Sequence, residues 1–320
     1  MHATSAPSLS GVFPVLPTPF DSTGQPDRDG LRTLVRYLIR CGVDGMAYPG
    51  VASEVSQLAA HEREQLTALV LQEVAGRVPV IVGASSDSLA VTLRLGAVAA
   101  RQGAAVLMVA APAQLQGVAA QVEHFASIAS ALPGVAIMLQ NVPPPAGAGL
   151  DPAVLIDILA AVPSIRYVKE ETLPSGQRLS RVRAHAPTSL LGLFGGAGGR
   201  YITDELRRGA CGTMPAIELA EVHVALFAAH RRGDAAAVRQ LFTRMLPVLN
   251  VQAVFRWSLT KYVLWRRGLI GEARQRMAGP LLDELDRQDV DAFLADLSDL
   301  LLPEQELAAC VTASPAAVAD

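Results

Sequence analysis

The sequence is poor in cysteine and has no cluster of basic residues. Its three cysteines, Cys41, Cys211 and Cys310, lack the spacing of metal ligands or of a disulfide framework, which suits a reducing cytoplasm. The six histidines form no H-x-x-x-H pair, so we expect neither a metal nor another cofactor. Only 18% of the residues are charged and the net charge is -3, which argues against nucleic acid or an anionic membrane surface as a partner.

Long apolar runs are also missing. The run "AAVLMVAAPA" reaches about half of the ~20 residues that a membrane-spanning helix needs. The first residues, "MHATSAPSLSG", contain neither the basic nor the apolar segment of a secretory signal. We therefore expect a soluble, cytoplasmic protein.

The pattern that is present alternates between β-rich and helical segments. With 320 residues, 51% of them hydrophobic, the chain can bury one large α/β core or two smaller ones. The predicted strands are Val12–Leu16, Gly45–Pro49, Val78–Gly83, Ala105–Ala110, Val135–Gln140, Ile165–Lys169, Leu190–Phe194 and Gly212–Ala216. The predicted helices between and after them are Asp29–Cys41, His61–Ala75, Ser88–Arg101, Val118–Ala131, Pro152–Ala161, Gly176–Ala184, Gly199–Arg208 and Ile217–Arg231.

Eight strands separated by single helices predict the fold class α/β, and specifically a (β/α)8 TIM barrel. A doubly wound open sheet is the alternative, but no G-x-G-x-x-G follows the first strand. The alternation stops after Gly233, where only helices are predicted (234–251, 255–267 and 280–301). We predict an N-terminal tail at 1–10, the barrel at 11–232, a C-terminal helical extension at 233–302 and a flexible tail at 303–320.

Lys169 lies at the end of the sixth predicted strand, in "IRYVKEET". Active sites of such barrels lie at the carboxyl ends of the strands. A lysine facing the barrel interior is poorly solvated, and its neutral amine can then attack a ketone to form an iminium. The alternative is an ion pair with Glu170 or Glu171 that only closes the barrel mouth, and the local sequence leaves both open.

Two other strand ends carry candidate binding groups. Gly50, Val51, Ala52 and Ser53 follow the second strand, where backbone N–H groups and the Ser53 hydroxyl can bind a carboxylate; the alternative is helix capping by Ser53 or Glu54. Gln140 is expected to face inward after the fifth strand, and Asn141 beside it is a candidate for substrate binding or simple turn formation. Gly195 and Gly196, after the seventh strand, would leave room for a substrate chain.

Taken together, these segments resemble the dihydrodipicolinate synthase / N-acetylneuraminate lyase family. The resemblance runs from Gly11 to about Ile270, through "GVFPVLPTPFDSTGQPD", "GVASE", "HERE", "QNVP", "VKEET", "FGGAGG" and "GACG". It implies a TIM barrel with a C-terminal helical extension, often tetrameric, whose strand-six lysine forms a Schiff base with pyruvate or another 2-oxo acid. Lys169 matches that lysine. The resemblance implies a homo-oligomer, a dimer or a tetramer, with a small 2-oxo acid as substrate.

The departures from the family pattern narrow the expectation. Gly50-Val51-Ala52-Ser53-Glu54 stands where the family usually has G-T-T-G-E, and Gln140 replaces the tyrosine of Y-N-V-P. Pro145 stands where an arginine often follows, and Ala113 and Gln114 where the synthases carry paired tyrosines. A true dihydrodipicolinate synthase is therefore not expected. The pattern is similar to the 2-keto-3-deoxy-L-arabinonate dehydratase branch, which also carries a glutamate two residues after the lysine, here Glu171.

We therefore expect a Schiff-base lyase that dehydrates a 2-keto-3-deoxy sugar acid. Lys169 would attack the ketone, and Glu171, its pKa raised by burial, would transfer the C3 proton. Gln140 would orient a water or the substrate. A pyruvate-releasing aldolase that uses the same lysine is one alternative, and a barrel that binds a 2-oxo acid without turnover is another.

Overall fold

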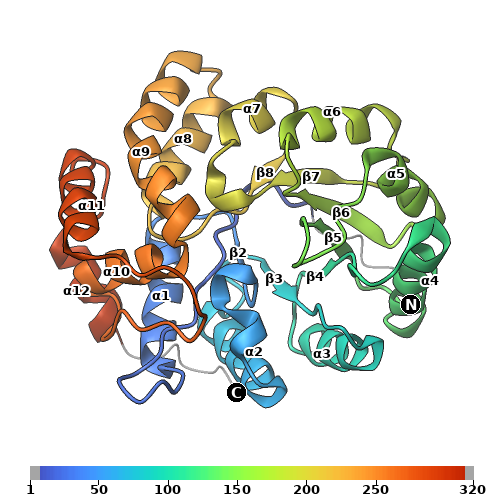
Figure 1. The fold of residues 1–320 in the computed structure, drawn as a ribbon, viewed down its shortest axis with the longest axis horizontal. Helices are drawn as coiled ribbons and strands as arrows, with labels where there is room; N and C mark the ends of the chain where they lie inside the picture. Colours follow the sequence, from blue (N-terminus) through green and yellow to red (C-terminus); the bar gives the residue numbers. More distant parts are fainter. Residues whose placement is uncertain (1–7, 314–320) are drawn as a thin grey trace. The chain divides into compact units, whose positions relative to one another are not determined.

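The fold is a (β/α)8 barrel followed by C-terminal helices. A computed structural model describes residues 8–313, in which eight strands alternate with helices α1 to α8 and helices α9 to α12 follow (Figure 1). The contacts of the chain divide it into two compact units. The first unit holds Val80–Ala197, Tyr201–Thr213 and residues 8–10, and the second holds Gly11–Pro79, Gly198–Arg200 and residues 214–313.

The first unit contains six parallel strands that are hydrogen-bonded in chain order. They are β3 (Val80–Gly83), β4 (Val106–Ala110), β5 (Ile137–Asn141), β6 (Ile165–Glu170), β7 (Gly192–Gly195) and β8 (Gly212–Thr213). The helices are α3 (Leu89–Arg101), α4 (Gly117–Ala131), α5 (Pro152–Ala161), α6 (Ser175–His185) and α7 (Ile202–Arg207). In Figure 1, α3 to α6 form a layer outside these strands.

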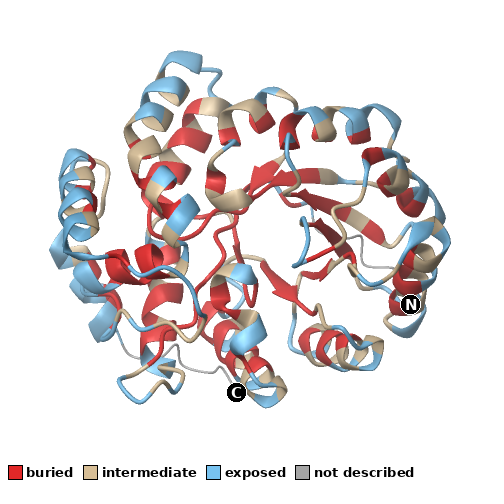
Figure 2. Cartoon of the chain, in the orientation of Figure 1, coloured by how far each residue is buried: buried red, intermediate tan, exposed pale blue. Residues whose placement is uncertain are grey.

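The strands of this unit are buried on both faces because their residues are apolar without alternation. Val106, Leu107 and Met108 of β4 are each at most 1% exposed, and Figure 2 shows β4 to β6 mostly as buried. Pro152 begins α5 at the first helical position, where its missing N–H costs nothing. The apolar strands thus fix the framework, and polar groups are confined to the strand ends.

The second unit contains two short strands and most of the C-terminal helices. The strands are β1 (Gly11–Val12) and β2 (Met46–Ala47). The helices are α1 (Arg28–Arg40), the 3-10 turns η1 (Val51–Ser53) and η2 (Val55–Gln57), α2 (Ala60–Val74), α8 (Ala220–Arg231), α9 (Ala235–Phe255), α10 (Trp257–Arg266), α11 (Glu284–Asp296) and α12 (Glu304–Thr312). The first strand is shorter than predicted because Pro14 and Pro17 have no N–H to donate to a neighbouring strand. Beyond Val12, Val15 forms isolated parallel β-bridges with Ala47 and Ala216.

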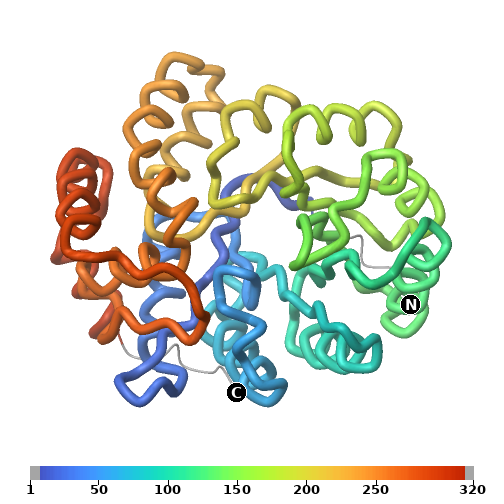
Figure 3. The backbone as a smooth tube through the Cα atoms, viewed as in Figure 1, coloured from blue at the N-terminus to red at the C-terminus, as the bar shows by residue number. Residues whose placement is uncertain are grey.

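The predicted flexible tail at 303–320 is wrong for its first part. Pro303 precedes α12, which packs on α1 and ends at Thr312; Figure 3 traces it in red. Leu307 and Cys310, three residues apart and so on one helical face, are each 6% exposed. Residues 314–320 lie outside the described residues, as do residues 1–7 of the predicted N-terminal tail. The predicted boundaries between barrel and extension stay a prediction.

None of the helices within residues 8–313 is both long and apolar enough to cross a membrane.

Candidate active site

Lys169 lies at the carboxyl end of β6 and is 4% exposed. In the sheet register it stands opposite Gln140 of β5 and Phe194 of β7. Its Nζ atom lies 3.2 Å from Oε2 of Glu171. The ion pair that the sequence left open is therefore present, with Glu171 and not Glu170 as the partner. It does not exclude nucleophilic chemistry, because an amine beside a carboxylate can pass its proton to that carboxylate.

Glu171 is the centre of a small network in the first unit. Its Oε2 atom accepts a hydrogen bond from Nε2 of Gln140 at 2.6 Å, and its Oε1 atom accepts one from the backbone N–H of Ala197 at 3.1 Å. Together with Lys169, three donors converge on one carboxylate that is 14% exposed. A carboxylate held in this way has a fixed position.

The pKa of Glu171 is lowered, which corrects the expectation that it is raised. Burial, the largest single influence, raises the pKa of this carboxyl. The Lys169 ammonium and the hydrogen bonds from Gln140 and Ala197 act in the opposite direction and together outweigh burial. Glu171 is therefore ionised in the unliganded protein and available as a base.

Gln140 occupies the place beside Lys169 where a tyrosine was expected from the family pattern. It is 4% exposed, and its amide holds Glu171. The hydroxyl of Tyr167, the tyrosine of β6, accepts a hydrogen bond from the N–H of Leu9 at 2.9 Å, and Tyr201 is 36% exposed. The titratable group in contact with Lys169 is the Glu171 carboxylate.

Asn141 and Glu170 form a second layer behind this pair, and Asn141 has no side-chain surface left for a substrate. Its Nδ2 atom donates to both oxygens of Glu170, at 3.1 and 2.9 Å, and to the carbonyl of Leu150 at 2.9 Å. Its Oδ1 atom accepts from the N–H of Leu150 at 2.7 Å. Nε of Arg178 lies 3.4 Å from Oε2 of Glu170. Asn141 holds the strand ends together, and its expected direct contact with substrate does not fit this environment.

Gly195 and Gly196 make room for glutamate side chains. A Cβ atom on Gly196 would lie 2.6 Å from Cγ and Oε1 of Glu171, and one on Gly195 would lie 1.8 Å from Oε2 of Glu205. Both distances are too short for non-bonded atoms, so any larger residue would displace a carboxyl group. Both glycines therefore have a structural role, and their expected role of leaving space for a substrate chain stays a prediction.

Gly50, Val51, Ala52 and Ser53 lie in the second unit, as the turn η1 after β2. The Ser53 hydroxyl accepts from the N–H of Gly50 at 2.9 Å and donates to the carbonyl of Leu16. That hydroxyl is 0% exposed and is used within the protein, which is the capping alternative. Among the described residues, the N–H groups of Val51 and Ala52 have no hydrogen-bond acceptor. These two N–H groups remain able to bind an anion.

A buried ion pair that the sequence analysis missed anchors this turn. Nζ of Lys261 contacts Oε1 of Glu54, and both side chains are 0% exposed. Oε2 of Glu54 accepts from the N–H groups of Arg276 and Met277, at 2.6 and 2.5 Å. Burial lowers the pKa of Lys261 to about 8, although Glu54 acts to raise it. The partners are more than 200 residues apart, so no local pattern could have revealed the pair.

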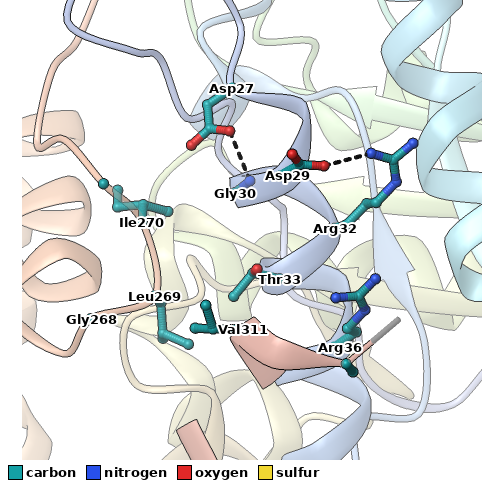
Figure 4. A pocket seen from close by; sticks show the side chains of 12 residues that line it. Asp27, Asp29, Gly30, Arg32, Thr33, Arg36, Gly268, Leu269, Ile270 and Val311 are labelled. Carbon is teal, nitrogen blue, oxygen red and sulfur yellow. Dashed lines mark hydrogen bonds and ion pairs between the residues drawn. The ribbon is translucent and has the colours of Figure 1, made fainter. Parts of the chain in front are cut away.

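A cavity of about 440 Å³ in the second unit contains none of the predicted site residues. Two of its acidic side chains form contacts within α1 or at its start. Asp27 accepts a hydrogen bond from the N–H of Gly30 at 2.9 Å, and Asp29 forms an ion pair with Arg32 at 2.7 Å (Figure 4). The remaining wall includes Gly268, Leu269, Ile270 and Val311. These groups are already paired, and they are unlike those expected for 2-oxo acid chemistry. Within residues 8–313, no group of three or more His, Cys, Asp or Glu side chains could hold a metal ion.

Comparison with known proteins places this arrangement in a family. The model of the dihydrodipicolinate synthetase family matches residues 8–297. The chain belongs to that family. The family membership predicted from "VKEET" and the other strand ends is thereby confirmed.

The relatives within the family include a sugar-acid dehydratase and 4-hydroxy-tetrahydrodipicolinate synthases. The chain is 29% identical over 307 residues to the L-2-keto-3-deoxyarabonate dehydratase of Azospirillum brasilense, covering 94% of this chain and 99% of that one. It is 32% identical over 254 residues to the 4-hydroxy-tetrahydrodipicolinate synthase of Thermomicrobium roseum, covering 75% of this chain and 78% of that one. Both are enzymes, which supports an enzymatic role.

Solved structures of the family confirm the fold. The dihydrodipicolinate synthase of Rhodopseudomonas palustris superposes with a TM-score of 0.85 at 28% identity, covering 91% of this chain and 99% of that one. The (β/α)8 prediction is therefore correct. The expected homo-oligomer and cytoplasmic location stay predictions.

Proposed function

We propose that this protein is a lyase that forms a Schiff base through Lys169 and dehydrates a 2-keto-3-deoxy sugar acid. The observation that carries the proposal is the position of Lys169, 3.2 Å from a carboxylate that Gln140 holds in place of the family tyrosine. The relationship to the A. brasilense dehydratase over nearly the whole chain supports this choice of substrate class.

The first step joins Lys169 to the ketone. The amine, having given a proton to Glu171, attacks C2 of the 2-oxo acid; the resulting carbinolamine loses its hydroxyl as water with the proton that Glu171 returns, which gives an iminium and leaves Glu171 ionised. Burial favours this step, because a lysine that is 4% exposed is weakly hydrated, and little water competes with the ketone for its amine.

The second step removes water from the bound substrate. Glu171, ionised and beside the nitrogen, takes a proton from C3, and the electron pair forms a neutral enamine. The enamine expels the C4 hydroxyl, which leaves as water with the proton from Glu171. The resulting unsaturated iminium is hydrolysed, and this releases the dehydrated 2-oxo acid and the free lysine. Gln140 cannot titrate, so it orients Glu171 throughout.

A product assay tests this choice between dehydration and aldol cleavage. Purified protein is incubated with 2-keto-3-deoxy acids of five and six carbons, and the products are identified by mass spectrometry. We expect a 2-oxo acid lighter than the substrate by one water, and no pyruvate. Release of pyruvate with an aldehyde would identify the aldolase instead. Absence of both products, together with binding of the acid, would identify a barrel that binds without turnover.

A further inference from the structure

Glu170, the last residue of β6, is a buried carboxyl group to which the proposed chemistry assigns no role. It is 0% exposed and stands in the chain between Lys169 and Glu171. Its oxygens accept hydrogen bonds from Nδ2 of Asn141 at 3.1 and 2.9 Å and from the N–H of Thr172 at 2.8 Å. The carboxyl group therefore joins the end of β5 to the turn that follows β6.

The backbone holds Lys169 and Glu171 in different ways. Lys169 lies within β6, which pairs with β5 on one side and with β7 on the other. Glu171 lies beyond the end of β6, and its own N–H donates to the carbonyl of Asn141 at 2.9 Å. The next N–H along the chain, that of Thr172, donates to the Glu170 carboxyl group. The peptide groups on both sides of Glu171 are thus fixed, and Glu170 supplies one of the two acceptors.

Arg178 of α6 holds the Glu170 carboxyl group from another side. Its Nε atom lies 3.4 Å from Oε2 of Glu170, and its Nη2 atom donates to the carbonyl of Leu150. Burial raises the pKa of Glu170, whereas the hydrogen bond from Asn141 and the charge of Arg178 act to lower it. Because an ionised carboxylate accepts a stronger hydrogen bond than a neutral carboxyl group, Arg178 strengthens the bond from Thr172.

We propose that Glu170 is a positioning residue of the candidate active site. It holds the backbone of Glu171 so that the Glu171 carboxylate meets the C3 proton of a substrate bound to Lys169. Glu170 touches no substrate in this account, and it acts through the peptide group of Thr172. Arg178 holds Glu170 in turn. The consequence for proton transfer rests on the proposed function, whereas the effect on the backbone of Glu171 does not.

Glu170→Gln keeps the shape of the side chain and removes its charge. Nδ2 of Asn141 donates to both oxygens of Glu170, so the new NH2 group faces a donor in either orientation. The side chain then no longer holds the turn in place. A displacement of about 1 Å at a reacting group can lower a rate by about 100-fold. Lys169 keeps its place in the sheet, so proton transfer by Glu171 is affected more than formation of the Schiff base.

Pyruvate separates these two steps. Borohydride traps its iminium with Lys169 for intact-mass analysis, and NMR in heavy water follows the exchange of its C3 protons. In that exchange Glu171 takes a C3 proton as the C–H electron pair forms the enamine, and a deuteron then returns to C3. In Glu170→Gln we expect the adduct to reach its wild-type extent. The exchange rate per adduct should fall by about 10- to 100-fold.

Two further sets of variants supply the rescue and the control. Arg178→Met should lower the exchange rate by about tenfold, and Arg178→Lys, which keeps the positive charge, should recover most of it. Glu73→Gln removes a buried carboxylate that pairs with Arg36, and its exchange rate should stay within about twofold of wild type. Equal exchange rates in Glu170→Gln and Glu73→Gln would overturn the proposal. So would a parallel loss of adduct and exchange, which would indicate a general loss of structure.

Hydrogen exchange of backbone amides tests the contact without substrate. In Glu170→Gln the Thr172 amide should exchange about tenfold faster, because a carboxamide accepts a weaker hydrogen bond than a carboxylate. The rate is taken relative to the amide of Leu139 inside β5, which reports the stability of the strand. An unchanged relative rate would contradict the proposal. If wild type exchanges no pyruvate protons, the proposed function fails, and the Thr172 rate alone decides this inference.

Discussion

At the scale of single residues, the site depends on two side chains and one backbone N–H that share the carboxylate of Glu171. Lys169 and Gln140 both contact Oε2 of Glu171, and the N–H of Ala197 donates to Oε1. The sequence predicted Lys169 because strand counting places it at a strand end. It could not predict that the pKa of Glu171 is lowered, because Gln140 and Ala197 lie 31 and 26 positions away. Burial and the charge of Lys169 are visible in the local sequence, but the hydrogen bonds from Gln140 and Ala197 are not.

Replacing Glu171 by glutamine tests its role as the base. Glu171→Gln keeps the side-chain shape but cannot accept the C3 proton, so we expect turnover to fall by roughly 10²- to 10⁴-fold. Reductive trapping with pyruvate should still detect an adduct, although more slowly, because Lys169 remains. Steady-state turnover and intact mass measure the two effects separately.

The matched control for this variant is Glu73→Gln. Glu73 is also buried, at 4% exposure, but it lies on α2 and pairs with Arg36 at 2.7 Å. Its replacement removes a buried carboxylate without touching the Lys169 network, so turnover should stay within about twofold. A Glu171→Gln enzyme as fast as Glu73→Gln would assign the proton transfer to another group.

At the scale of elements, the carboxyl ends of β5 and β6 position the site. Gln140 with Lys169 and Asn141 with Glu170 are successive pairs in the β5–β6 register, so one pair faces the chemistry and the next holds the strand ends. Period-two alternation made this predictable for Gln140. The sequence predicts substrate binding by Asn141 because it does not show the hydrogen bonds between Asn141 and the backbone of Leu150. Leu150 lies in a loop whose path no sequence pattern fixes. The glycines of "FGGAGG" were visible as a motif, but their glutamate neighbours were not.

Helix α12 is the element that the sequence analysis missed, and its removal has a measurable cost. Ending the chain after Leu302 would remove the buried Leu307 and Cys310 and the Arg40–Glu306 ion pair at 2.7 Å. We expect a loss of about 2–3 kcal/mol, mostly from apolar burial, and a melting temperature lower by a few degrees. Ending the chain after Ala313 retains these contacts and serves as the control. Equal melting temperatures for the two truncations would show that α12 adds nothing to stability.

At the scale of the whole molecule, the order of eight strands and eight helices was predictable because each strand is an apolar run of a few residues and each helix is longer. The family membership followed from short motifs at the strand ends, and the relatives share the fold over nearly their full length. Long-range pairs such as Glu54 with Lys261 were beyond prediction, because each member sits in an unremarkable local sequence. The sequence thus predicts the fold, Lys169 and Glu171, while the contacts of Glu171 with Gln140 and Ala197 are known only from the three-dimensional structure.

The central claim is that Lys169 forms a Schiff base with a 2-oxo acid. Borohydride reduction in the presence of pyruvate, read by intact mass, tests it most directly, with Lys261→Arg as a control for a second buried lysine. Wild type and Lys261→Arg should gain the mass of one reduced pyruvate adduct at Lys169, and Lys169→Ala should gain none. An adduct in Lys169→Ala would contradict the account. So would the absence of an adduct in both wild type and Lys261→Arg with every 2-oxo acid tried.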